Sequence, residues 1–327
     1  MKIEDSVRKM ELRELEGFWI GNAQDTEAGT GCTAILCPDG AVCGVDVRGA
    51  APASRETELL RPVNMIEQVH AVMLSGGSAF GLAAGDGAMQ FLAERGYGFE
   101  TGFGVVPIVC GASLFDLATG RNDVRPDKAM GYAACSAAEK KEPVRSGNYG
   151  AGTGASVGKY LGASYMMKGG LGVAALAAGD VKCAAIVAVN CLGDVWDTES
   201  GEVLAGVLNE EKNEIRSTRE RMLRDITSTK DVFSGNTTLG CILTNARLTK
   251  SQCNKLASVT HNAYARAITP VHTSADGDTI FAMSFGSAEA APDALGVLAV
   301  LAMERAIADA VRSAEPAYGI PAARSLK

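Results

Sequence analysis

Short runs of β-prone apolar residues alternate along the chain with long stretches of helical pattern. The β-prone runs are residues 32–36, 41–47, 71–74, 105–109, 184–190, 237–244 and 279–284. Residues 78–95, 251–268 and 292–313 have the composition or the apolar spacing of helices. Thr249 and Gln252 are spaced as a capping box at the start of the second helix. Strands and helices in such blocks favour helices layered on β-sheets.

Length and apolar content indicate one compact domain. A chain of 327 residues, 47% of them hydrophobic, can bury about three quarters of its unfolded surface. No proline-rich or Gly/Ser-rich linker divides it, and apolar segments recur from Thr33 to Ala302. We therefore expect a single domain over residues 1–327.

Charge and hydropathy limit the expected partners. The net charge is −7, and lysines and arginines are scattered among acidic residues. Nucleic acid is therefore an unexpected partner. No apolar run approaches the roughly 18 residues that span a bilayer, so we expect a cytoplasmic protein without membrane contact.

The nine cysteines stand singly, without a C-x-x-C pair, which argues against a zinc cluster and a disulfide framework. Small or apolar residues flank most of them, so we expect free thiols buried as small hydrophobic groups. The three histidines are His70, His261 and His272. We expect neither a histidine-rich metal site nor a cofactor.

Glycine-rich segments occur at residues 76–77, 147–158 and 169–172, and they predict turns and close packing of backbone. The first resembles the G-x-S-x-G nucleophile elbow, but Phe80 stands at the final glycine. We interpret Ser78 as a helix cap instead. The charged residues 208–231 predict a solvated helix or a mobile loop.

The second glycine segment resembles a phosphate-binding loop but departs from it at two positions. Thr153 stands at the first Walker glycine and Tyr160 at the magnesium-binding hydroxyl. The dinucleotide fingerprint also fails in spacing. Lys159 remains as a lone cation after a glycine run, either catalytic or an ordinary surface lysine.

Asn236-Thr237 lies where a charged stretch ends and the apolar run of residues 238–243 begins. Attack of the Thr237 hydroxyl on the preceding carbonyl would form an ester that water opens, giving fragments 1–236 and 237–327. The threonine would then carry a nucleophilic hydroxyl and a free α-amine of pKa about 7.7–8.0. The alternative is a turn entering a strand, where threonine is favoured.

Asp276-Gly277-Asp278 precedes another apolar run. If the strand includes Asp278, both carboxylates point to one face and could hold an ammonium group or share a proton. The alternative is a turn with two solvated aspartates. Asn190 ends the run of residues 184–189, and its amide could donate to an oxyanion or satisfy a turn.

Together these segments resemble the L-aminopeptidase/D-esterase (DmpA-like) family, which includes nylon-oligomer hydrolases. The resemblance covers nearly the whole chain. It is carried by residues 74–82, 106–109, 150–155, 168–172, 189–190, 236–239 and 276–279. It implies a four-layer αββα sandwich of the N-terminal-nucleophile type, within the α+β class. It also implies a precursor that is cut before its nucleophile, and a homo-oligomer of four or more chains.

The resemblance implies a role for each matching residue. Thr237 matches the nucleophile, Asn236 the residue before the cut and Asn190 the oxyanion donor. In the nylon-hydrolase branch, Lys159 matches a catalytic lysine, and the aspartates at 276 and 278 match a pair of aspartates. The aminopeptidase branch has a serine nucleophile and a Ser-x-Glu pair, and its oxyanion-binding tyrosine has no counterpart near residues 111–116. Its substrate preference is therefore not carried over.

The resemblance thus predicts an aminopeptidase or amidase acting on peptides or small amides through an acyl-enzyme on Thr237. Two other functions remain open. One is acyl transfer to an amine by the same nucleophile. The other is a binding protein that is never processed and does not catalyse.

Overall fold

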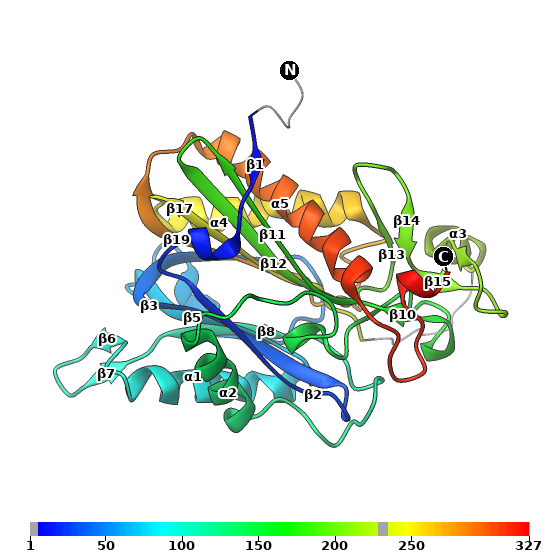
Figure 1. Ribbon diagram of the computed structural model, residues 1–327, viewed down its shortest axis with the longest axis horizontal. Coiled ribbons are helices and arrows are strands. Elements are labelled where there is room, and N and C mark those ends of the chain that lie inside the picture. The colour runs from blue at the N-terminus through cyan, green and yellow to red at the C-terminus, as the bar shows by residue number, and fades with distance from the viewer. Residues whose placement is uncertain (1–5, 228–234, 327) are drawn as a thin grey trace.

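The computed structural model describes residues 6–227 and 235–326. Figure 1 shows two layers of strands enclosed by two layers of helices, which confirms the four-layer αββα sandwich. One half contains β11 (Gly170–Ala178), β12 (Val181–Val189), β17 (Leu239–Ala246), β19 (Thr279–Ala288), α4 (Lys250–Ala267) and α5 (Pro292–Ser313). The other contains β2 (Trp19–Asp25), β3 (Thr30–Val47), β5 (Gln68–Ser75), β8 (Val109–Ser113), α1 (Ala84–Ala93) and α2 (Lys128–Glu139).

The two halves also contain smaller elements. Short strands and one short helix occupy edges and loops: β1 (Arg8–Lys9), β4 (Ser54–Arg55), β6 (Phe99–Glu100), β7 (Val105–Val106), β9 (Ser156–Val157), β10 (Met167–Lys168), β13 (Asp194–Trp196), β14 (Val203–Ala205), β15 (Val207–Leu208), β16 (Ile215–Arg216), β18 (Ile268–Thr269) and α3 (Thr218–Arg224). In the described part of the chain, none of the helices has the length and apolar character needed to cross a bilayer.

The two strand layers are one continuous sheet, in the order β1-β11-β12-β17-β19-β3-β5-β8-β4 with β2 beside β3. The long strand β3 joins them. Its first part pairs with β2 and β5, and its last part pairs with β19, after a register shift between Leu36 and Ala41. The sheet therefore folds over itself along β3, and both layers share its backbone hydrogen bonds.

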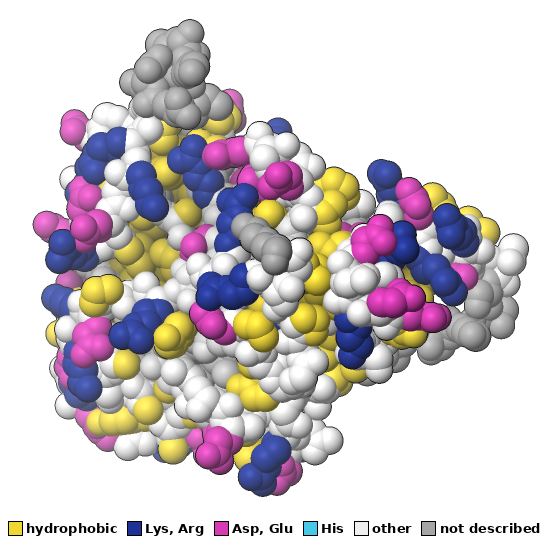
Figure 2. Space-filling model, turned by 45° about the vertical axis from the view of Figure 1, so that its right-hand side comes forward, with side chains coloured by type: hydrophobic (Ala, Val, Ile, Leu, Met, Phe, Trp, Pro, Cys, Tyr) yellow, Lys and Arg dark blue, Asp and Glu magenta, His cyan; other side chains and the backbone are white. Residues whose placement is uncertain are grey.

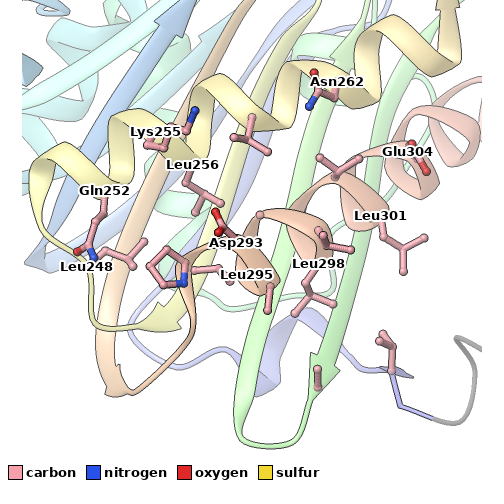
Figure 3. Close-up of a pocket in the computed structure, with 18 of the residues that line it drawn as sticks. Leu248, Gln252, Lys255, Leu256, Asn262, Asp293, Leu295, Leu298, Leu301 and Glu304 are labelled. Atoms are coloured by element: carbon pink, nitrogen blue, oxygen red, sulfur yellow. The ribbon is translucent and has the colours of Figure 1, made fainter.

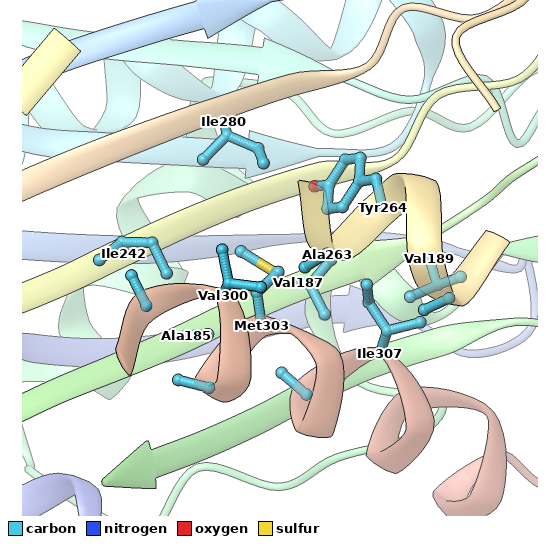
Figure 4. Packing of buried hydrophobic residues seen from close by; sticks show 14 of the residues in the cluster. Ala185, Val187, Val189, Ile242, Ala263, Tyr264, Ile280, Val300, Met303 and Ile307 are labelled. Carbon is cyan, nitrogen blue, oxygen red and sulfur yellow. The ribbon is translucent and has the colours of Figure 1, made fainter. Parts of the chain in front are cut away.

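Three hydrophobic clusters fill the three interfaces between the four layers. The cluster between the strand layers contains Ile35, Val72, Ile186, Leu239 and Phe281. A second cluster lies between the sheet and the helices α4 and α5, where Val187, Ile242, Met303 and Ile307 meet (Figure 4). A third lies under α1 and α2 and includes Phe91. Burial of each such side chain stabilises the fold by about 1.5–3 kcal/mol.

Strand β12 belongs to both of the first two clusters, because successive side chains point to opposite faces of a sheet. Val187 and Val189 face the helices, whereas Ile186 and Ala188 face the other strand layer. A strand that is apolar on both faces is buried on both faces. The continuous apolar run of residues 184–189 therefore places Asn190, which follows it, deep inside the molecule.

The structure confirms most elements predicted from sequence and corrects others. Helices α4 and α5 match their predicted ranges, and the Thr249–Gln252 capping box is formed. Residues 169–172 are mainly strand, not a turn: a Cβ at Gly172 would lie 1.9 Å from the Ala306 carbonyl oxygen of α5, so the predicted close packing is present. Ser78 makes no cap hydrogen bond, because Gly77 holds the N-cap position.

Residues 208–227 include the end of β15, the strand β16 and the short helix α3, so a helix covers only part of the charged stretch. The last residues of that stretch, 228–231, lie outside the described residues. On the face drawn in Figure 2, lysines and arginines lie among aspartates and glutamates. Opposite charges are thus interspersed on this face.

Candidate active site

Asn236 and Thr237 lie just before β17, beside the segment that leads into β19. The two strands run parallel, with Leu239 opposite Thr279. An isolated parallel bridge extends this pairing to Asn236 and Asp276. Parallel pairing therefore brings the candidate cleavage junction and the aspartate pair together at the N-terminal ends of β17 and β19.

Thr237 is 3% exposed, and its amide nitrogen and hydroxyl each donate to one backbone carbonyl. Its amide nitrogen donates to the carbonyl oxygen of Asn190 at 2.9 Å. Its hydroxyl Oγ1 donates a short hydrogen bond to the carbonyl oxygen of Asn236. Gly277 N donates to that same oxygen at 3.0 Å. The carbonyl oxygen before Thr237 therefore accepts from two donors, of which Gly277 N would stabilise negative charge on it.

Gly277 can approach this closely because it lacks a side chain. A Cβ at this position would lie 2.7 Å from Thr237 Oγ1 and 2.8 Å from the Ala51 carbonyl oxygen. Contacts that short would displace the hydroxyl. The glycine between the two aspartates is thus a steric requirement of the site.

Asn190 is fully buried, and its carboxamide has a fixed orientation. Oδ1 accepts from Lys159 Nζ at 2.6 Å and from Ser156 N at 3.1 Å. Both partners can only donate, which identifies that atom as the oxygen. Nδ2 donates to the Phe115 carbonyl oxygen at 3.0 Å and has a second hydrogen for another acceptor. This second hydrogen is available for the predicted role of Asn190 as the oxyanion donor.

Lys159 is 5% exposed, which rules out an ordinary surface lysine. Its Nζ lies 3.3 Å from the carbonyl oxygens of both Asn190 and Gly235. Burial lowers the pKa of Lys159 to about 8, against the opposing effect of nearby negative groups that include Asp276. Near pH 7 the site therefore holds a cation between the end of β12 and the residue before Asn236.

The two aspartates are each 1% exposed, which excludes a turn with two solvated carboxylates. Asp278 Oδ1 accepts from Thr238 N at 2.8 Å. Asp276 Oδ2 accepts from Thr273 N at 2.7 Å, and its Oδ1 has no hydrogen-bond partner among residues 6–227 and 235–326. Burial and the charge of Asp278 raise the pKa of Asp276 to about 6.

All five candidate side chains thus meet around one junction. The sequence did not identify His272, whose Nδ1 lies 2.8 Å from Asp278 Oδ2. Nor did it identify the backbone donors of Gly277 and Ser156 or the acceptor of Phe115. Position 272 lies close in sequence to the aspartates, but that is the only signal that could have pointed to it.

An apolar groove of about 480 Å³ lies elsewhere, between helices α4 and α5 (Figure 3). Leucines such as Leu256, Leu295 and Leu298 line it, and Lys255 and Asp293 are among its polar residues. None of the candidate site residues lines it.

All nine cysteines are free and buried, as expected. Burial raises the pKa of every one of these thiols, which keeps them protonated and poorly reactive near neutral pH. Across the described ranges, no three His, Cys, Asp or Glu side chains are grouped to hold a metal ion.

Comparison of the sequence with known proteins gives a consistent picture. The sequence model of peptidase family S58 matches residues 11–324. An uncharacterized aminopeptidase of Mycobacterium leprae is 38% identical, over 95% of this chain and 92% of its own. A 6-aminohexanoate-oligomer endohydrolase of Agromyces sp. is 32% identical, over 86% of this chain and 77% of its own.

Two solved structures share the fold. The L-aminopeptidase D-Ala-esterase/amidase of Ochrobactrum anthropi, described as a variant of the Ntn hydrolase fold, has a TM-score of 0.67 at 17% identity. The alignment covers 92% of this chain and 85% of that one. A Burkholderia sp. beta-aminopeptidase has a TM-score of 0.65 at 19% identity, over 94% and 88% of the two chains. At these identities the likeness establishes the fold alone.

Proposed function

Because this chain belongs to peptidase family S58, we propose that it cuts itself between Asn236 and Thr237 and then uses Thr237 as an N-terminal nucleophile. The protein is a hydrolase that acts on amide bonds. The observation that carries the proposal is the buried Asn236 carbonyl, whose oxygen accepts from both Thr237 Oγ1 and Gly277 N.

Self-cleavage begins with attack of Thr237 Oγ1 on the carbonyl carbon of Asn236. The peptide C–N bond breaks, the hydroxyl proton passes to the Thr237 nitrogen, and an ester joins the two residues. The oxyanion formed on the way is stabilised by Gly277 N, 3.0 Å from that oxygen. Water then hydrolyses the ester, which leaves a carboxylate on Asn236 and restores the hydroxyl of Thr237.

The cut changes the chemistry of Thr237 nitrogen from an amide to an α-amine. The carbonyl oxygen of Asn190, 2.9 Å from this nitrogen in the uncut chain, is positioned to keep the amine beside its own hydroxyl. An α-amine has a reference pKa of about 7.7–8.0, so a large share is neutral near pH 8 and can accept the hydroxyl proton. One residue then provides nucleophile and general base.

In turnover, Thr237 Oγ1 attacks the substrate carbonyl while the α-amine takes its proton. The oxyanion accepts the second hydrogen of Asn190 Nδ2, and Lys159, 2.6 Å from Asn190 Oδ1, stabilises the negative charge. The C–N bond breaks, and the leaving amine departs with the proton. Water hydrolyses the resulting ester, releases the acid and returns the proton to Oγ1.

The substrate class is peptides or small linear amides. Support comes from the curated relatives, whose names describe aminopeptidases and hydrolases of 6-aminohexanoate oligomers. The site itself contains the hydroxyl of Thr237, the cation of Lys159 and two aspartate side chains, all of them buried.

Variants at the junction test this function. Thr237→Ala removes the hydroxyl, and we expect one uncut chain on a denaturing gel with no hydrolysis of a peptide or 6-aminohexanoate-oligomer substrate. Thr238→Ala is the matched control, because the Thr238 hydroxyl has no hydrogen-bond partner in the described part of the chain and Asp278 binds only its backbone nitrogen. We expect this control to be cut. Two fragments from Thr237→Ala would overturn the assignment.

A further inference from the structure

His272 makes two hydrogen bonds to one oxygen of Asp278. Its backbone nitrogen donates to Asp278 Oδ2 at 3.2 Å, and its ring Nδ1 lies 2.8 Å from the same atom. The residue has a φ of 57°, a left-handed conformation that non-glycine residues seldom adopt. This conformation brings the backbone and side-chain donors to the same carboxylate.

The ring nitrogen Nδ1 is paired with Asp278. Because a carboxylate only accepts hydrogen bonds, this pairing suits the tautomer that carries its hydrogen on Nδ1. The remainder of the ring packs against aromatic side chains of α4. Its centroid is 4.9 Å from that of His261 and 6.1 Å from that of Tyr264, both of which are buried. The imidazole is therefore held on two sides, and its orientation is defined.

Asp278 carries this constraint to the nucleophile. Its other oxygen, Oδ1, accepts from Thr238 N at 2.8 Å, and Thr238 immediately follows Thr237. Three nitrogens thus surround the carboxylate, two of them from His272. The geometry of the peptide that follows the nucleophile depends on a carboxylate that the histidine holds in place.

We propose that His272 is a positioning residue that acts through Asp278 to align Thr237 for self-cleavage and for turnover. The inference rests on the proposed function, since it assumes that Thr237 is the nucleophile. His272 does not contact the reacting atoms. Its effect is to fix the side chain that binds the start of β17.

Two substitutions separate the side-chain hydrogen bond from the backbone conformation. His272→Asn keeps a donor near the position of Nδ1, and asparagine tolerates a positive φ. His272→Gly also tolerates the conformation but has no side-chain donor. Lys212→Gly is the matched control, because Lys212 is exposed and has the same φ of 57°.

We expect His272→Gly to slow self-cleavage and to lower kcat by up to about 100-fold, because a misplaced nucleophile reacts more slowly. KM should change less, because the histidine does not touch the substrate. On a logarithmic scale, His272→Asn should recover at least half of the loss in cleavage rate and in kcat. Lys212→Gly should match wild type in both. The readouts are the rate of fragment appearance, kcat and KM, with thermal unfolding midpoints to show that each variant folds.

A wild-type rate in His272→Gly, or equal losses in the glycine and asparagine variants, would overturn the proposal. Combination with Asp278→Asn gives a second test. If the histidine acts through that carboxylate, the double variant is no slower than Asp278→Asn alone, whereas multiplied losses contradict it. Failure of the proposed function is distinct, because either the wild-type chain would then stay intact or Thr237→Ala would still be cut.

Discussion

Lys159 Nζ lies 2.6 Å from Asn190 Oδ1, so the buried cation and the proposed oxyanion donor form one unit. The lysine and Ser156 N occupy the oxygen of the carboxamide. Its nitrogen is thereby directed to the other side, toward the Phe115 carbonyl and any further acceptor. A charge-assisted hydrogen bond of this kind is stronger than a neutral one. It therefore holds the Asn190 carboxamide, and with it the Nδ2 donor, in one orientation.

Asn190→Asp should separate self-cleavage from turnover. The aspartate keeps an oxygen acceptor for Lys159 and Ser156 but loses the Nδ2 donor. The Asn190 carbonyl that binds Thr237 N belongs to the backbone, and Gly277 N stabilises the cleavage oxyanion, so the variant should still be cut. We expect kcat to fall about 100- to 1,000-fold. A normal kcat in the cut variant would contradict the role of Asn190.

Lys159→Met should lower both the cleavage rate and kcat by about 100-fold, because the site loses its cation. Lys250→Met is the matched control. Lys250 is also buried, and its Nζ donates to three backbone carbonyls, at Leu59, Arg61 and Asn64. That control should keep wild-type cleavage and kcat. Equal losses in both variants would show that any buried lysine matters only for folding.

Gly277→Ala should slow self-cleavage by more than about 10-fold, because a Cβ 2.7 Å from Thr237 Oγ1 displaces the nucleophile. A time course of fragment appearance measures the effect. Gly296→Ala in α5 is the control. Its Cβ would meet only Val259 at 3.4 Å, so alanine should stabilise the helix by about 0.5–1 kcal/mol without changing cleavage. Cleavage of Gly277→Ala at the wild-type rate would contradict the geometry.

Asp276 should make stability fall as pH rises from 4 to 7. Its folded pKa of about 6 exceeds the reference value of 3.8, so the folded protein binds more protons in this window. The free energy of unfolding therefore declines by up to about 3 kcal/mol relative to Asp276→Asn. Urea midpoints of both forms, each in the uncut Thr237→Ala background, measure the difference. A difference that is constant with pH would contradict the raised pKa.

Local signals in the sequence identified the elements that carry them strongly. Helix α4 has the Thr249–Gln252 capping box, and α5 begins with proline and has a continuous apolar pattern. By contrast, α2 was missed because its buried face consists of small residues such as Gly131, Ala134 and Ala138, although Asp127 caps it through Met130 N. The start of β11 was not predicted as a strand, because glycines there resemble turn residues in the sequence. In the structure they allow α5 to pack closely against the strand.

The candidate site was predictable residue by residue but not as an arrangement. Single motifs indicated Asn190, Thr237 and the two aspartates, and a family resemblance assigned their roles. The parallel pairing of Asn236 with Asp276 joins segments forty residues apart, which no local pattern encodes. The left-handed conformation of His272 depends equally on tertiary contacts. Backbone donors such as Gly277 N cannot be recognised from residue type, because every residue except proline has a backbone N–H.

Self-cleavage at Asn236-Thr237 is tested by mass spectrometry of the purified wild-type protein under denaturing conditions. We expect two fragments, residues 1–236 and 237–327, with a free α-amine on Thr237 in the second. Sequencing from that terminus should begin Thr-Thr-Leu-Gly. A single intact chain of 327 residues in a preparation that hydrolyses amides would contradict it.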